Sequence, residues 1–160
     1  MLSQSLIEEK SLDFRESIYY KVQIELAFNS SHIEGSQLSH EQTRYIFETN
    51  TIGFEEWTSI KVDDIIEVSN HFTAFDYLID SFQDELTEKW IKDIHSILRR
   101  QTSDARKSWF RVGAYKAIPN EVGGEQTSLP ENVATDMASL IKHYHNLPMI
   151  SIEDILDFHV

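Results

Sequence analysis

A hydroxyl and a carboxylate lie four residues apart at the point where a long helical pattern ends. They belong to Ser30 and Glu34, and Gly35 follows directly. Residues four apart share one face of a helix, and a glycine just past the last turn is typical of a helix C-terminus. Backbone carbonyls already place partial negative charge there, so the Glu34 carboxylate favours a cation or an arginine fork. On these residues alone, a solvated glutamate beside an ordinary glycine cap is the simpler interpretation.

A second cluster of small and polar residues occurs far downstream, in Gly113-Ala-Tyr-Lys-Ala-Ile-Pro-Asn120-Glu-Val122-Gly123-Gly124. The glycine pair predicts a tight turn, and we expect a β-hairpin around Val112–Val122, with Pro119 marking an edge strand. An exposed strand edge can pair with an extended segment of another protein. An ordinary surface hairpin explains the same residues.

Taken together, the two stretches resemble motifs of Fic (filamentation induced by cAMP) domain proteins. The string Asn-Ser-Ser-His-Ile-Glu-Gly, which contains Ser30, Glu34 and Gly35, resembles the inhibitory-helix motif of that family. The downstream stretch is similar to the Fic flap, and it is followed by Thr127 and Pro130 as in the family. Lys116 stands where the family usually has arginine. The resemblance covers roughly the whole chain.

The resemblance implies a fold and a function. It implies an all-α, Fic-like helical bundle with one small β-hairpin, the flap. It implies a protein adenylyltransferase that transfers AMP from ATP, with Mg²⁺, to a Ser, Thr or Tyr hydroxyl of a target protein. Glu34 would be the inhibitory group and Ser30 would steady it, with Gly35 ending the helix. The residues Asn120, Val122, Gly123 and Gly124 would belong to the flap over the target.

One family motif is missing from these 160 residues. The catalytic signature, His-x-Phe-x-Asp/Glu-Gly-Asn-Gly-Arg-x-x-Arg, does not occur, and nothing after His159 resembles a phosphate-binding loop. No other common phosphate loop or catalytic serine elbow occurs either. We therefore expect no catalytic residue in this chain, which is inactive as it stands and truncated relative to the family. The alternatives are a non-catalytic helical regulatory or interaction module, and a Fic protein that removes AMP.

Length and composition set further bounds. The 160 residues suit a single domain, with an inhibitory-helix region at about 1–50 and a Fic core that lacks the catalytic loop at about 60–160. The net charge of −13 argues against nucleic acid or an anionic membrane as partner, and it disfavours ATP binding unless positive groups are supplied locally. The absence of cysteine, of a long apolar run and of a signal peptide favours a cytoplasmic protein. We also expect apolar surface to remain open and the chain to self-associate as a homo-oligomer.

Hydrophobic periodicity predicts about seven helices. The first should run without a break from about Leu12 to Glu34, and the second from a capping box at Ser39 and Gln42 to about Thr49. Further helices are expected from Val62 to about Phe82, from a Thr87 cap through Arg99 and Arg100, from Glu131, and from a Ser151 cap onward. The segment from Asn50 to Ser59 reads as a loop.

Other residues that could do chemistry are better explained without it. His143 and His145 are two residues apart and do not place both rings on one helix face, and no carboxylate partner can be assigned to them or to His159, so we predict no metal site. His95 is interpreted as structural. Three acidic residues, Asp63, Asp64 and Glu67, crowd neighbouring turns of one helix, and we expect them to form a solvated surface.

Overall fold

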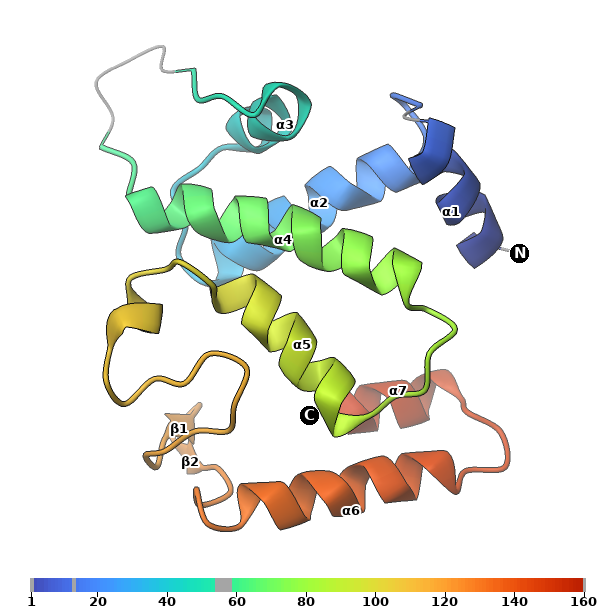
Figure 1. The fold of residues 1–160 in the computed structure, drawn as a ribbon, viewed down its shortest axis with the longest axis vertical. Coiled ribbons are helices and arrows are strands. Elements are labelled where there is room, and N and C mark those ends of the chain that lie inside the picture. Colours follow the sequence, from blue (N-terminus) through green and yellow to red (C-terminus); the bar gives the residue numbers. More distant parts are fainter. Residues whose placement is uncertain (1, 13, 54–58, 160) are drawn as a thin grey trace.

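The computed structural model describes residues 2–12, 14–53 and 59–159 of the chain. The fold is all-α, with seven helices and one two-stranded antiparallel hairpin in the described residues (Figure 1). The elements are α1 (Leu2–Leu12), α2 (Ile18–Ile33), α3 (His40–Thr49), α4 (Val62–Asp80), α5 (Glu88–Arg99), a short 3₁₀ helix (Asp104–Arg106), β1 (Glu121–Val122), β2 (Glu125–Gln126), α6 (Val133–His145) and α7 (Ile152–His159).

The prediction of one unbroken helix from Leu12 to Glu34 was wrong, because the chain turns between α1 and α2. Glu16 adopts a left-handed backbone with φ of 75°, and Ser17 begins the new helix by accepting a hydrogen bond from the Tyr20 amide at 3.1 Å. A serine N-cap can begin a helix without any proline or glycine before it. The break lets α1 fold back onto α2 and α4, where Leu6 and Ile7 pack on Tyr19 and two side chains of α4.

Two small clusters of buried side chains centre on α4. One joins α2 to the C-terminal half of α4 and consists of Tyr19, Phe75 and Ile79. The other joins α3 and the loop before it to the N-terminal half of α4, and consists of Leu38, Ile46 and Val68. The predicted capping box of α3 is confirmed, since Ser39 and Gln42 exchange both hydrogen bonds. Only part of the predicted Asn50–Ser59 loop can be assessed, because 54–58 lie outside the described residues.

Helix α5 crosses α4 and is fixed to it at both ends. Thr87 caps its start as predicted, and the indole nitrogen of Trp90 donates to Ser81 Oγ at 2.9 Å. At the other end, Asn70 of α4 donates its side-chain amide to the carbonyls of Leu98 and Arg100, each at 2.9 Å. Arg99 lies in the last turn as expected, whereas Arg100 already has an extended backbone.

Between α5 and α6 the chain is largely irregular, and its hairpin is shorter than predicted. Only Glu121–Val122 and Glu125–Gln126 form strands, whereas we expected strand structure from Val112. A chain that turns at Gly113, with φ of 70°, cannot continue as a straight strand.

The C-terminal helices keep much of their apolar surface exposed. Ile141 is the buried residue of α6, and α5 has no fully buried residue in the described structure. Ile152, Ile155 and Leu156 of α7 are 73%, 53% and 58% exposed. Helix α7, which follows α6 at the C-terminal end of the fold (Figure 1), therefore presents apolar side chains that the described residues leave uncovered. In the described part of the chain, no helix is both long enough and apolar enough to span a bilayer.

Candidate functional site

The end of α2 closes with two characteristic hydrogen bonds. The Gly35 amide donates to the His32 carbonyl at 3.0 Å, and the Ser36 amide donates to the Ser31 carbonyl at 2.9 Å. This pair of bonds is the Schellman motif, which needs a left-handed residue at its centre. Gly35 supplies it with φ of 94°, so the predicted role of this glycine at the helix end is confirmed. Glu34 is thereby placed at the C-cap, at the rim of the helix.

The Glu34 carboxylate lies against an arginine from another helix. Its Oε2 is 2.9 Å from Nη2 of Arg99, at the end of α5. The other terminal nitrogen of the same guanidinium, Nη1, lies 3.0 Å from Oε1 of Glu67 in α4. Arg99 therefore bridges the ends of three helices, and it is the partner that the structure gives Glu34. The Glu34 side chain remains 41% exposed, against 27% for Arg99 and 19% for Glu67.

The first turn of α4 binds the two segments that follow α2 and α5. The prediction that its acidic residues form a solvated surface is therefore wrong. Asp64 is 4% exposed and accepts a hydrogen bond from the Gln37 amide, just after the end of α2. Asp63 accepts from the Ser103 amide at 3.0 Å and from the Ser103 hydroxyl, just after the end of α5. Carboxylates at a helix N-terminus are favoured by the dipole and can accept the free amides of neighbouring loops. The sequence placed these residues on one turn but did not show the two loops that pack against it.

Burial shifts the pKa of several groups around Arg99. Burial raises the pKa of Glu67, against the pull of Arg99, and Glu34 adds to the rise as a nearby like charge. Burial lowers the pKa of His71, and Arg99 lowers it further while Glu34 opposes this. The pKa of His95 is also lowered, first by burial and then by Arg99. Burial thus disfavours the protonated form of both imidazoles in a cluster that also holds one guanidinium and two carboxylates.

Ser30 contributes to this site through its backbone. Its carbonyl accepts the Glu34 amide at 3.3 Å, but its hydroxyl makes no hydrogen bond to any residue in the described ranges. The proposed steadying role of the Ser30 side chain therefore stays a prediction.

The hairpin is held at its base and exposed at its tip. The Lys116 ammonium donates to Asn120 Oδ1 at 2.5 Å and to the Thr127 hydroxyl, and that hydroxyl donates to the Asn120 carbonyl at 2.9 Å. Gly123 and Gly124 form the two-residue turn, with φ of 61° and 85°. Two successive positive φ angles suit the right-handed twist of a hairpin.

No hydrogen bond or ion pair in the described part of the chain joins this hairpin to Glu34. The predicted flap residues Asn120, Val122, Gly123 and Gly124 therefore form a group separate from the Glu34 site. Val122 is 67% exposed, so its side chain packs on little of the domain.

His95 fixes the loop that leads to the hairpin. Its Nδ1 accepts a hydrogen bond from the Gly113 amide at 3.0 Å, and its ring lies 5.7 Å from that of Phe110. A Cβ at Gly113 would come within 3.1 Å of Ser96 Cβ, so the loop approaches α5 closely there. These contacts agree with the structural interpretation of His95.

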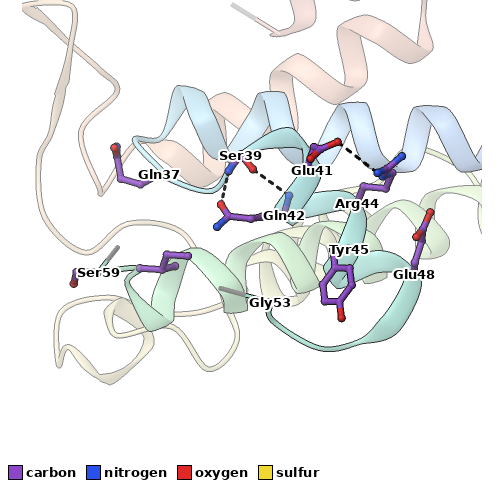
Figure 2. Close-up of a pocket in the computed structure, with 10 residues that line it drawn as sticks. Gln37, Ser39, Glu41, Gln42, Arg44, Tyr45, Glu48, Gly53 and Ser59 are labelled. Carbon is purple, nitrogen blue, oxygen red and sulfur yellow. Dashed lines mark hydrogen bonds and ion pairs between the residues drawn. The ribbon is translucent and has the colours of Figure 1, made fainter. Parts of the chain in front are cut away.

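A separate cleft lies beside α3, with a volume of about 750 Å³ (Figure 2). Its polar lining residues are largely bonded to one another. Ser39 and Gln42 form the capping box, and Arg44 pairs with Glu41 at 3.6 Å. These interactions stabilise α3 itself, so the cleft adds no candidate site.

The residues present do not by themselves fit ATP and Mg²⁺. Both terminal nitrogens of Arg99 already contact carboxylates, so its positive charge is offset before any phosphate arrives. Within the described ranges, no group of three or more histidine, aspartate or glutamate side chains is arranged to hold a metal ion.

A solved structure shares this architecture. It is that of a Fic domain containing signaling protein from Bacteroides thetaiotaomicron, with a TM-score of 0.65 and 23% sequence identity over 91% of this chain. The chain has a Fic-like fold. It spans 56% of the length of that structure, so nearly half of the matched protein has no counterpart here. No family model matches the sequence, and no curated protein matches it.

The Fic-like fold confirms the predicted fold class, while the roles of individual residues remain predictions. Sequence reasoning missed Arg99 as the partner of Glu34, and Glu67 as the second carboxylate on Arg99. The available signal was an arginine in the last turn of α5. The division into regions of about 1–50 and 60–160 also stays a prediction.

Proposed function

We propose that this chain is the regulatory and target-binding part of a Fic protein adenylyltransferase. The reaction is the transfer of AMP from ATP, with Mg²⁺, to a Ser, Thr or Tyr hydroxyl of a target protein. Catalysis depends on the signature His-x-Phe-x-Asp/Glu-Gly-Asn-Gly-Arg, which a segment outside this sequence has to supply. In this proposal Glu34 is the inhibitory group, and the hairpin at Gly123 and Gly124 aligns the target.

The observation that carries the proposal is the presentation of Glu34 on a Fic-like fold. A Schellman motif and an ion pair hold a partly exposed carboxylate at the end of an early helix. One of its oxygens, Oε1, has no hydrogen-bond partner among the described residues, so it can meet a further cation. The exposed hairpin supports the second half of the proposal, because strand edges bind extended peptide segments through main-chain hydrogen bonds.

The test begins with the gene. If the reading frame continues after Val160 into the catalytic signature, the protein that contains both parts is assayed for incorporation of labelled AMP into itself and into cell proteins. Replacing Glu34 by glycine should raise incorporation roughly tenfold or more, since a charge-assisted contact is worth about 1.5–3 kcal/mol. Glu25→Gly, on an exposed carboxylate in the middle of α2, should leave incorporation at the starting level. No gain for Glu34→Gly would contradict the inhibitory role.

A non-catalytic interaction module is the second candidate. The observation that favours it is the pairing of Arg99 with two carboxylates, which leaves this cluster with no excess positive charge for a phosphate. This candidate predicts no ATP turnover, no heat of ATP binding in calorimetry, and a stop codon after Val160. Removal of AMP from targets by the same fold is a third outcome, and loss of label from a pre-modified target would reveal it.

A further inference from the structure

Arg99 is the only cation that an ion pair joins to Glu34 within the described part of the chain. We infer that Arg99 is a positioning residue, which holds the Glu34 carboxylate in its regulatory pose and leaves one of its oxygens for a cation from outside this sequence. The inference rests on the proposed function and adds to it a residue that neither the family motif nor the structural comparison assigns.

The backbone around Arg99 is fixed from two sides, so its side chain starts from a defined point. The Asn70 amide, which is 4% exposed as a residue, binds the carbonyls on either side of Arg99. The carbonyl of Arg99 itself accepts a hydrogen bond from the hydroxyl of Thr102, a residue that is 1% exposed. Buried hydrogen bonds of this kind make a backbone position costly to move.

The side chain of Arg99 is then oriented by Glu67. Glu67 is the least exposed of the three charged groups and occupies Nη1, which turns Nη2 toward Glu34. A planar guanidinium held on one side presents its other side in a fixed direction. Arg99 thus fixes the position of the Glu34 carboxylate, at the exposed end of α2, relative to α4 and α5.

The net charge of Glu34, Glu67 and Arg99 favours a second cation beside Glu34. Two carboxylates share one guanidinium, which leaves one negative charge in excess. Oε1 of Glu34 makes no hydrogen bond or ion pair within the described residues, so a donor can reach it without displacing Arg99. The same carboxylate can therefore be positioned by one arginine and still engage another.

The first experiment measures the coupling between the two residues without any enzyme activity. Glu34→Gln, Arg99→Gln and the double variant of the chain are unfolded in urea. We expect the two effects on the unfolding equilibrium constant to be coupled by about threefold, as is typical of partly exposed ion pairs. The matched control replaces Arg44, which pairs with Glu41 within α3 and makes no ion pair with Glu34. Arg44→Gln should show no coupling to Glu34→Gln, and equal coupling for both arginines would overturn the inference.

The second experiment uses the protein that also contains the catalytic signature. Arg99→Gln should raise AMP incorporation in the same direction as Glu34→Gly, and combining the two should give no further gain. Arg99→Lys, which keeps the charge but loses the fork, should fall between the wild type and Arg99→Gln. Arg44→Gln, which removes an ion pair within α3, should match the wild type.

The outcomes separate this inference from the proposed function. Activation by Glu34→Gly without activation by Arg99→Gln would overturn the positioning role and leave the proposed function intact. Absence of activation by Glu34→Gly would overturn the proposed function, and the urea coupling would then decide whether Arg99 holds Glu34.

Discussion

The end of α2 and the hairpin tip both contain glycines with positive φ, but the first is held by contacts with distant helices and the second by local contacts. At the end of α2, residues from α4 and α5 contact the turn and the segments beside it. At the hairpin, the contacts are local, between Lys116, Asn120 and Thr127.

This difference matches what each part is proposed to do. A group that blocks a site has to be held at a defined position, because a loose carboxylate would block it only part of the time. A strand edge that binds peptides of different sequence benefits from a tip that adjusts to each of them. The same residue type, glycine, therefore serves a rigid end in one region and an adaptable turn in the other.

The largest difference between the regions should appear on truncation of an apolar side chain. Leu38, which is 3% exposed, follows the end of α2 and packs on Ile46 and Val68. Leu38→Ala should lower the free energy of unfolding by about 2–5 kcal/mol, measured by urea denaturation. Val122→Ala in the hairpin should change it by less than about 0.5 kcal/mol. Similar losses for both variants would remove the distinction.

A smaller loss is expected when the anchor of the first loop is removed. Asp64→Ala leaves the Gln37 amide without its acceptor and should cost about 1–3 kcal/mol of unfolding free energy. Glu121→Ala, in the exposed first strand of the hairpin, is the matched control and should cost almost nothing. Thermal unfolding followed by circular dichroism measures both. An unchanged melting temperature for Asp64→Ala would show that the loop does not depend on this bond.

Placing alanine at the two turns tests rigidity more finely. Gly35→Ala should cost about 1–2 kcal/mol of global stability, because a side chain disfavours the left-handed conformation. Gly124→Ala meets the same local strain but should mainly open the hairpin, with little change in global unfolding. Hydrogen exchange separates the two: amide protection should fall around Ser36 and Gln37 in the first variant, and only around Val122 and Glu125 in the second.

The smallest effect concerns pH. His71 has a lowered pKa because it is buried, so the folded chain disfavours its protonation. The resulting stability is present above the ordinary value of 6.5 and is lost as the pH falls through the lowered folded-state value. The urea midpoint should therefore drop between pH 7.5 and 5.5, and His71→Gln should weaken that dependence. The hairpin contains no histidine, so its amide exchange, corrected for the intrinsic rate, should not follow this transition.

Much of the fold could be predicted from local patterns. The capping boxes, the Thr87 cap and the glycine after α2 each depend on a few neighbouring residues, and the structure confirms them. The break before α2 was missed because it depends on Glu16 in a left-handed conformation, which sequence patterns rarely signal. The predicted hairpin was too long because the turn at Gly113 depends on contacts with α5, which the local sequence does not show.

The sequence predicted the helix end that carries Glu34, but not the residues that contact it. The Ser30 and Glu34 spacing drew attention to the helix end, since it lies within one turn. The partners Arg99 and Glu67 lie far away in the chain, and no local pattern pairs a carboxylate with a distant arginine. For the same reason, Asp63 and Asp64 read as surface charges until the loops after α2 and α5 are seen to meet them.

Those two loops bind adjacent residues, Asp64 and Asp63, in one turn of α4. The lengths of the segments Gly35–Gln37 and Arg100–Ser103 therefore set the distance between Glu34 and Arg99. Adding or deleting one residue in either segment would turn Glu34 or Arg99 away from the other while leaving every helix intact. Length variation among natural versions of this protein should accordingly be tolerated in the hairpin and rejected in these two short spans.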